Sequence, residues 1–592
     1  MCDVGKRIKA TIIGAGPGGL AAAMLLAAKG HEVTVLEKQT YLGGRTSALR
    51  LGEYIFDRGP TFLMMLPVLE ELFELAGRRL QDYVELKRVD PLYTLKFGEL
   101  EFSPGGSPHE TARQIEELFP GNGERYLRFM HRERDKLARV LPLLKRPFTS
   151  VGGYLSADML RALPRLDAAD TVHKRLLRYF TDERLRWAFS FQSKYLGMSP
   201  WECPGTFTIL SFMEHEYGLH HPIGGLNRIS EAMADVAREH GADIRMGSGV
   251  RRIIVEHGRT CGVELDSGKR LEADDVVINA DFGHAATHLF EPGTLKSYTP
   301  AKMKKKKLSL STFMLYLGIN AELPLPHHKI LFAADYRSNV DDMTERMVLS
   351  EEPSLYIHNP SKLDPTLAPS GKSALYLLLP VPNNRSGINW KEQAQAMRTV
   401  MLERLAAECG LAGIAAVEAL IEVEEMYTPD DWEQQSYVYE GATFNLAHSL
   451  DQMMYLRPRN KFQEVDHCYL VGGGTHPGSG LPTIIQSAII SAQLLEDSYR
   501  EASRRRGLLG RWRRGAPNVF GAFHASGESS SSAAPNVFGA SAKSHTSGKP
   551  TASTASGAFC TSGESSISAA PNVSGTSAAF HASGATQEGS PS

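Results

Sequence analysis

The chain of 592 residues is too long for one small core, and its length predicts two or three domains. A formal net charge of −2 gives no overall field that favours nucleic acid, so we expect no nucleic-acid partner. The six cysteines show no CxxC spacing, which predicts no disulfide framework and no metal site and is typical of a reducing, cytoplasmic compartment.

Residues 10–28 form an uncharged stretch between Lys9 and Lys29, as in a short membrane span or a signal sequence. The stretch contains Gly-Ala-Gly-Pro-Gly-Gly, which would break a spanning helix in its middle. A buried strand, a turn and a buried helix explain it better. No other uncharged run approaches spanning length, so we expect no membrane-spanning segment.

The first predicted unit reads as strand, glycine-rich turn, helix and strand, with strands over 10–13 and 32–36. Gly14, Gly16 and Gly19 have the GxGxxG spacing. The first glycine permits the turn, the second lets the backbone approach a pyrophosphate, and the third lets helix and strand pack closely. Glu37 ends the second strand, where it can accept hydrogen bonds from ribose hydroxyls and would repel the 2′-phosphate of NADP. The unit therefore predicts a dinucleotide site.

A second close-approach loop follows, since Gly43-Gly44-Arg45 combines two glycines with a fixed cation. Residues 56–61 then read Phe-Asp-Arg-Gly-Pro-Thr. Together with the first unit, these motifs resemble the FAD-binding amine oxidase and carotenoid desaturase superfamily. The resemblance implies FAD as the cofactor, with the Gly-Gly-Arg loop on its phosphates and ribityl chain. It also implies that Pro60 and Thr61 lie in a segment beneath the flavin.

Residues 250–281 predict a β-meander, with turns at His257-Gly258 and 266–268, followed by a strand that ends in Asn279-Ala280-Asp281. Any β-hairpin gives the same pattern. The superfamily resemblance implies that this segment returns to the nucleotide-binding sheet and that Val250 meets the adenine.

A late glycine loop, "GGGTHPGSGLPTII" at residues 472–485, lies between a predicted strand over 469–471 and a helix with Pro482 in its first turn. The positive end of that helix is suited to the pyrimidine edge of a flavin, where negative charge develops on reduction. The loop also resembles the C-terminal signature of bacterial-type carotenoid desaturases. Many amine oxidases carry an acid where this chain has Thr475-His476. His476 is a candidate general base, with a loop-shaping role as the alternative.

The candidate cofactor-binding residues come from these loops and strand ends. They are Gly14, Ala15, Gly16, Pro17, Gly18, Gly19, Glu37, Lys38, Gly43, Gly44, Arg45, Pro60, Thr61, Val250, Gly473, Gly474, Thr475, Gly480, Leu481 and Pro482.

The resemblance runs from residue 8 to about 497 and implies an α/β fold, with a Rossmann-like FAD-binding domain of the GR2 type and an inserted mixed α+β substrate domain. The predicted FAD-binding domain comprises residues 1–64, 215–285 and 462–500. Residues 65–214 and 286–461 make the predicted substrate and membrane-associating domain. A basic linker, 501–515, and a disordered low-complexity tail, 516–592, complete the prediction.

The resemblance implies an FAD-dependent carotenoid desaturase of the phytoene desaturase kind, acting on phytoene or C30 diapophytoene by hydride transfer to flavin N5. The alternatives are a terminal-methyl carotenoid oxygenase, a carotene cis–trans isomerase and a non-enzymatic lipid-binding protein resembling the Rab GDP-dissociation inhibitors. A lipophilic polyene substrate implies peripheral membrane attachment at the cytoplasmic surface, and oxygen or a quinone as the electron acceptor. The apolar segment 141–166, with scattered Arg and Lys, is either the face that meets the membrane or an internal helical subdomain.

Overall fold

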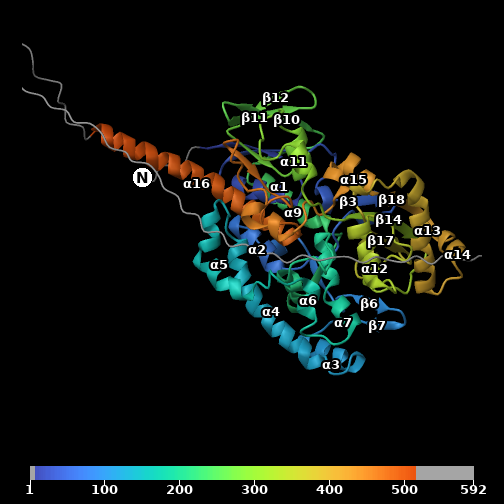
Figure 1. The fold of residues 1–592 in the computed structure, drawn as a ribbon. Coiled ribbons are helices and arrows are strands. Elements are labelled where there is room, and N and C mark those ends of the chain that lie inside the picture. Colours follow the sequence, from blue (N-terminus) through green and yellow to red (C-terminus); the bar gives the residue numbers. More distant parts are fainter. Residues whose placement is uncertain (1–6, 515–592) are drawn as a thin grey trace, which may run out of the picture. The chain divides into compact units, whose positions relative to one another are not determined.

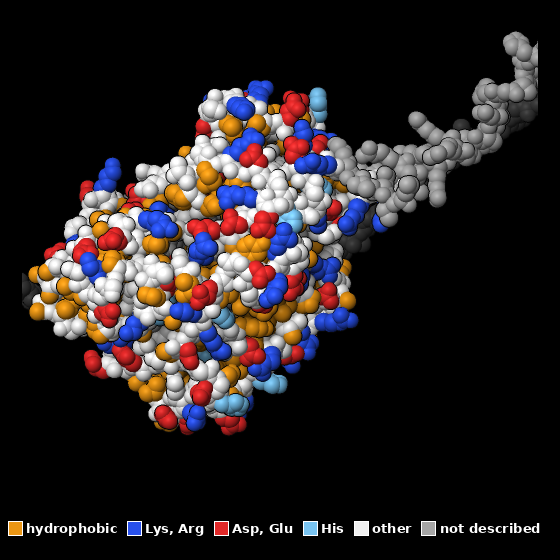
Figure 2. Space-filling model, turned by 180° about the vertical axis from the view of Figure 1, so that it is seen from behind, with side chains coloured by type: hydrophobic (Ala, Val, Ile, Leu, Met, Phe, Trp, Pro, Cys, Tyr) orange, Lys and Arg blue, Asp and Glu red, His pale blue; other side chains and the backbone are white. Residues whose placement is uncertain are grey.

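The computed structural model describes residues 7–514. These described residues belong to one compact unit. The tail predicted over 516–592 lies outside the described residues. On the face seen in Figure 2, acidic and basic side chains are interspersed, in keeping with the small net charge.

A parallel five-stranded sheet in the order β19-β13-β1-β2-β9 is the centre of the nucleotide-binding half. Its strands are β1 (Lys9–Ile13), β2 (Glu32–Leu36), β9 (Asp243–Arg245), β13 (Asp275–Ile278) and β19 (Cys468–Leu470). These strands come from the beginning, the middle and the end of the described chain. The sheet therefore brings the carboxyl ends of β1 and β19 to the same edge, where doubly wound sheets bind ligands.

Both faces of this sheet are covered. Helices α1 (Pro17–Ala28), α9 (Asn227–Glu239) and α16 (Leu481–Arg514) pack into one apolar core on one face. The other face packs against a three-stranded sheet of β10 (Val250–Glu256), β11 (Arg259–Leu265) and β12 (Arg270–Glu272), which Figure 1 shows as a separate layer. Strands covered on both faces can be almost continuously apolar, as β13 is.

A seven-stranded, largely antiparallel sheet forms the centre of the other half, in the order β18-β14-β17-β16-β15-β6-β7. Its strands are β6 (Thr94–Phe97), β7 (Leu100–Phe102), β14 (Ser311–Ile319), β15 (His328–Leu331), β16 (Leu355–His358), β17 (Ser373–Val381) and β18 (Ile421–Tyr427). Helix α13 (Trp390–Cys409) packs on one face through an apolar core. The other face packs against the hairpin of β3 (Ala48–Leu51) and β4 (Tyr54–Asp57).

Helices build the wall opposite this sheet. The largest core beneath them is aromatic and holds Tyr126, Phe129, Phe189 and Phe212. The remaining helices are α2 (Leu66–Leu75), α3 (Pro108–Leu118), α4 (Gly123–Leu144), α5 (Ala157–Ala162), α6 (Val172–Leu176), α7 (Glu183–Ala188), α8 (Ile209–Tyr217), α10 (Phe282–His288), α11 (Pro300–Lys304), α12 (Tyr336–Asp341), α14 (Ile414–Glu418) and α15 (Pro429–Ser436). A last strand pair, β5 (Leu86–Val89) and β8 (Leu219–Pro222), connects the two halves.

Two features of the termini differ from the expectation. Helix α1 begins at Pro17, inside the glycine-rich segment expected to form only a turn, so Gly18 and Gly19 belong to its first helical turn. Helix α16 continues to Arg514, so most of the segment predicted as a basic linker, 501–515, is helical. Among the described residues, no helix is both long enough and apolar enough to cross a membrane.

Candidate active site

The first glycine loop joins β1 to α1 at the carboxyl edge of the parallel sheet. Gly14 has a φ of +97°, which glycine adopts without a Cβ clash, and its N–H donates to the carbonyl of Leu36 at 2.8 Å. Gly16 is the N-cap of α1, and no side chain among the described residues caps that helix. The first N–H groups of α1 and the positive end of its dipole are therefore free to bind an anion.

Gly18 and Gly19, in the first turn of α1, allow close packing. A Cβ on Gly19 would lie 2.1 Å from the carbonyl oxygen of Gly14, and one on Gly18 would lie 2.6 Å from Oδ1 of Asn279. The backbone N–H of Ala15 is directed at Glu37. Half of the residues predicted in this loop line the cavity described below, namely Gly14, Gly16 and Pro17.

Glu37 is buried at the end of β2, and backbone groups hold its carboxylate. Ala15 donates its N–H to Oε2 at 2.7 Å, and Gln39 donates its N–H to Oε1 at 2.8 Å. Each oxygen keeps a second lone pair for a ribose hydroxyl. The neighbouring Lys38 has its pKa lowered to about 8 by burial, against the opposing effect of Glu37, and its ammonium lies over the ring of Tyr437.

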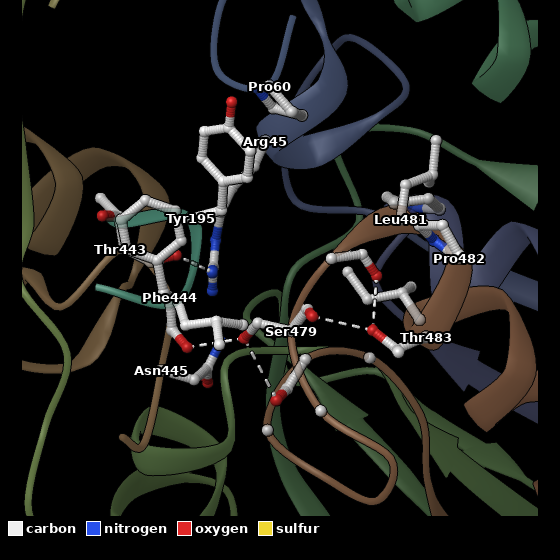
Figure 3. A pocket seen from close by; sticks show the side chains of 18 of the residues that line it. Arg45, Pro60, Tyr195, Thr443, Phe444, Asn445, Ser479, Leu481, Pro482 and Thr483 are labelled. Carbon is white, nitrogen blue, oxygen red and sulfur yellow. Dashed lines mark hydrogen bonds between the residues drawn. The ribbon is translucent and has the colours of Figure 1, made fainter. Parts of the chain in front are cut away.

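The Gly43-Gly44-Arg45 loop faces the first glycine loop. Both glycines have positive φ, and a Cβ on Gly44 would lie 3.4 Å from Cα of Gly16. Arg45 donates Nη2–H to Oδ2 of Asp281 at 2.8 Å and Nη1–H to the carbonyl of Thr443 at 2.6 Å, as Figure 3 shows for Thr443. Burial raises the pKa of Asp281 and the Arg45 guanidinium opposes that rise. The predicted fixed cation is thus held by partners from two distant segments.

The late glycine loop connects β19 to α16 and meets the first loop directly. A Cβ on Gly18 would lie 3.1 Å from the backbone nitrogen of Gly472. Asn279, at the end of β13, lies between the loops and donates Nδ2–H to the carbonyl of Gly14 at 3.3 Å. Ser479 fixes the loop, since its hydroxyl donates to the carbonyl of Phe444 at 2.6 Å and its carbonyl accepts from Thr483 at 2.8 Å (Figure 3).

Arg457 also holds the late glycine loop in place, and no motif in the sequence predicts this role. Its side chain is fully buried and donates to the carbonyl of Gly473 at 2.7 Å and to that of Thr475 at 3.1 Å. Burial lowers the pKa of Arg457 to about 9. Its charge is solvated by backbone carbonyls, which places a buried cation beneath the loop that carries Gly473.

The two residues between the glycines of the late loop have structural partners. Thr475 is buried and its hydroxyl donates to the carbonyl of Pro458 at 2.6 Å. His476 lines the cavity, but its Nε2 contacts the carbonyl of Arg146 at 3.1 Å, so this nitrogen carries the proton. Burial lowers the pKa of His476 to about 4. These contacts favour the loop-shaping role over that of a general base.

Residues of both glycine loops line one cavity of about 890 Å³. Its polar end is lined by the predicted residues Gly14, Gly16, Pro17, Glu37, Lys38, Gly44, Arg45, Pro60, Thr61, Val250, Gly473, Gly474, Gly480, Leu481 and Pro482. Gly43 and Thr475 do not line the cavity themselves, but each is adjacent in the chain to a glycine that does, Gly44 and Gly474. The set suits FAD, because a helix N-terminus faces the cavity where the diphosphate is expected, a buried carboxylate where the ribose is expected, and glycines where a Cβ would intrude.

The other end of the cavity is an apolar arm between the helices and the seven-stranded sheet. Its lining includes Leu137, Val140 and Leu144 of α4, Met159 of α5, Phe191, Tyr195, Phe207, Leu210 and Met213 near α8, and Met314, Tyr376 and Leu378 of the sheet. Leu163 and Leu450 line the arm and are 61% and 52% exposed, so the arm reaches the surface there. An apolar channel of this kind suits a long hydrocarbon.

Two titratable groups beside the apolar arm were not anticipated from the sequence. Lys194 lines the arm, and burial lowers its pKa to about 7. Glu214 lies behind Tyr195, where burial raises its pKa to about 7, although contacts with Gln192, Tyr195 and Tyr93 oppose the rise. Gln192 donates to Oε2 of Glu214 at 2.8 Å. A buried carboxyl group whose pKa is raised to about 7 is mostly neutral below that pH.

The sequence model of the family described as flavin containing amine oxidoreductase matches residues 17–495. The chain is 46% identical over 489 residues to a 4,4′-diapophytoene desaturase (4,4′-diapolycopene-forming) of Methylomonas sp, covering 83% of this chain and 95% of that one. It is 37% identical over 497 residues to a zeta-carotene-forming phytoene desaturase of Myxococcus xanthus, covering 83% and 94%. It is 33% identical over 502 residues to a neurosporene-forming phytoene desaturase of Rhodobacter capsulatus, with the same coverage.

Solved structures share the fold at low sequence identity. An oxidoreductase from Methanosarcina mazei superposes with a TM-score of 0.54 at 18% identity, covering 81% of this chain and 99% of that one. A cyclohexylamine oxidase from Brevibacterium oxydans superposes with a TM-score of 0.53 at 17% identity, covering 84% and 100%. The predicted α/β flavoprotein fold is thereby confirmed.

Proposed function

Because the chain belongs to the flavin-containing amine oxidoreductases and, within them, to the carotenoid desaturases, we propose that it desaturates the C30 precursor 4,4′-diapophytoene. It is an FAD-dependent oxidoreductase that acts in carotenoid desaturation. The C30 substrate is supported by the 46% identity to one 4,4′-diapophytoene desaturase, while a second such enzyme, of Staphylococcus haemolyticus, is 30% identical and the phytoene desaturases are 37% and 33% identical. The first of these relatives supports 4,4′-diapolycopene as the product.

The chain's own residues would hold FAD at the polar end of the cavity. We assign the diphosphate to the N-terminus of α1 and the facing Gly44, and the adenosine ribose to Glu37. The late loop, fixed by Ser479 and Arg457, would support the flavin. When bound, FAD supplies the acceptor for the hydride that leaves an allylic carbon of the substrate.

The apolar arm would hold the polyene and keep water out. Its leucine, methionine and aromatic side chains form no hydrogen bonds with a hydrocarbon and so do not fix its position along the arm. The substrate can therefore slide and present successive bonds to one reaction site. The positive charge that develops on the substrate is delocalised along its double bonds, so a strong base is not required for loss of the neighbouring proton. This agrees with His476, whose basicity is low.

We also propose that the protein attaches to a membrane surface through the mouth of the arm. Val151, Leu155, Leu160 and Leu163 are 61%, 78%, 57% and 61% exposed, and belong to the segment that lines the arm through Met159. Apolar side chains that are exposed together at a channel mouth are more stable in contact with lipid than with water. This contact would let a water-insoluble substrate enter the arm without crossing water. A membrane quinone or oxygen would accept the electrons.

Expression in cells that make either 4,4′-diapophytoene or phytoene, followed by mass spectrometry of the pigments, tests this function. We expect a C30 product that lacks two hydrogen atoms for each new double bond. Added oxygen would instead identify a terminal-methyl oxygenase, and an unchanged mass with a changed chromatographic position would identify an isomerase. Conversion of phytoene alone would refute the C30 proposal. Supplying a quinone under anaerobic conditions then separates the two electron acceptors.

A further inference from the structure

Three buried histidines from two separate sheets converge outside the cofactor cavity. His221 lies on β8, His327 immediately precedes β15, and His358 ends β16. Each side chain offers one nitrogen, and the three nitrogens lie within 4.8 Å of one another. The histidines are 1%, 9% and 0% exposed. We propose that they form a binding site for a divalent transition metal, with zinc as the preferred ion.

The spacing of the nitrogens fits this ion. The Nε2 atoms of His327 and His358 are 3.3 Å apart. Ligand atoms at about 2.0–2.1 Å from a tetrahedral zinc lie about 3.3 Å from one another. Two of the three ligands therefore already have the required separation, and the third has to approach by at most about 1.5 Å. Three imidazoles with an open fourth position are a donor set that zinc accepts.

The hydrogen bonding of these rings points to a missing partner. The contact between the two Nε2 atoms is the one hydrogen bond that either ring makes among the described residues, because both Nδ1 atoms have no partner. Buried polar side chains normally satisfy their hydrogen-bonding groups. Two facing nitrogens can share only one proton, whereas a cation between them would use both lone pairs.

A carboxylate is placed to orient the third ligand. Asp364 is fully buried, and its Oδ2 lies 3.1 Å from Nε2 of His221. This contact fixes the proton on Nε2 and leaves the lone pair on Nδ1, as in the carboxylate–histidine–zinc arrangement. Neither Asp364 nor the nearby buried Asp57 has a salt bridge to lysine or arginine within residues 7–514. A dication would neutralise this local negative charge.

The site would connect the two halves of the fold. Asp364 also accepts the N–H of Gly224, in the turn that leads from β8 into α9. Asp57 accepts the N–H of Leu226, one residue before that helix begins. A metal on His221, His327 and His358 would therefore fasten the seven-stranded sheet to the turn before α9. The sequence predicts no metal site, since these ligands are far apart in the chain and form no spaced motif.

Metal content of the FAD-loaded protein tests the proposal. The full chain, purified without a polyhistidine tag, is dialysed against zinc chloride and then metal-free buffer, and its zinc is measured by plasma mass spectrometry. We expect about one zinc per chain. His221→Asn and His358→Asn should lose it, whereas His220→Asn, on the same strand but with its side chain on the other face, should retain it. Bound FAD confirms that each variant folds.

A second measurement covers variants that fail to fold. Competition with a zinc-binding dye gives the affinity of the wild-type chain and of Asp364→Asn, which should bind zinc about 10- to 100-fold more weakly. Removing zinc from the wild-type chain with a chelator should lower its melting temperature without releasing FAD. A wild-type chain that retains no zinc, or equal retention by His221→Asn and His220→Asn, would overturn the proposal.

Discussion

The guanidinium of Arg45 lies 2.8 Å from the carboxylate of Asp281, although 236 positions separate them in the sequence. This pair joins the Gly-Gly-Arg loop to the segment after β13, and a second bond from Arg45 reaches Thr443. The loop that faces the first glycine turn is therefore held by contacts with the rest of the chain rather than by its own sequence.

Asp281→Asn should weaken FAD binding by roughly tenfold. The substitution leaves a partly buried guanidinium without its carboxylate, and a loss of about 1–2 kcal/mol is reasonable for a pair of which Arg45 is 31% exposed. Titration of the apoprotein with FAD, followed by flavin fluorescence, gives the affinity. Arg50→Met, which removes an exposed arginine on β3, is the control and should bind FAD normally. Unchanged affinity in Asp281→Asn would show that the pair does not hold the loop.

Gly19→Ala should reduce both FAD retention and stability. Its Cβ would lie 2.1 Å from the carbonyl of Gly14, so α1 has to move away from β1, at a cost of about 1–3 kcal/mol. Thermal unfolding and the ratio of flavin to protein absorbance report the two effects. Gly152→Ala is the matched control, because the nearest atom to its Cβ would be the Ser150 hydroxyl at 3.4 Å. Equal flavin content in the two variants would contradict the packing role of Gly19.

Glu214 should make stability depend on pH. Its pKa is raised from 4.5 to about 7 by burial, so folding takes up a proton between these values. The stability that this group contributes is fully present below pH 4.5 and is lost as pH rises through 7, by up to about 3 kcal/mol.

The comparison with Glu214→Gln isolates this effect, since glutamine keeps the shape without the titration. Melting temperatures measured from pH 5 to pH 8 should show the wild type losing stability relative to the variant as pH rises. Parallel curves would mean that Glu214 is ionised throughout or does not titrate in this range.

Replacing two exposed leucines should release the protein from lipid. Leu155→Glu with Leu160→Glu puts charge on the apolar mouth, where each leucine is worth about 1.5–3 kcal/mol on burial, so vesicle binding should fall by more than tenfold. Co-sedimentation with phosphatidylglycerol vesicles measures this. Leu75→Glu alters a leucine that is 53% exposed on α2 and should bind as the wild type does. Equal binding by all three proteins would place the membrane contact elsewhere.

Local pattern was sufficient for the parts of the site that are built from neighbouring residues. The strand at 32–36 and the turn at Gly14 follow from apolar periodicity and glycine spacing, which act over a few residues. Arg457 and Asn279 could not be found in this way, because each is defined by what it contacts after folding. A buried arginine in "YLRPRN" looks like any surface arginine until the late loop packs over it.

The same reasoning explains the difference at the C-terminal end. Residues 501–515 are predicted as a linker from their strongly basic composition, yet α16 continues through them to Arg514. Good helix formers such as arginine and leucine extend a helix that a buried first half has already nucleated. The amino-acid composition of a segment indicates how much apolar surface it can bury. It does not indicate where a helix that began earlier in the chain ends.

The position of β19 at the edge of the parallel sheet constrains the order in which the fold is completed. The ribosome finishes β1 and its turn first, but Gly472 and Ser479 emerge only after some 470 residues have been made. Until then, the nascent domain lacks a strand and half of its cofactor cradle. FAD can therefore contact both glycine loops only after the last strand has joined the sheet.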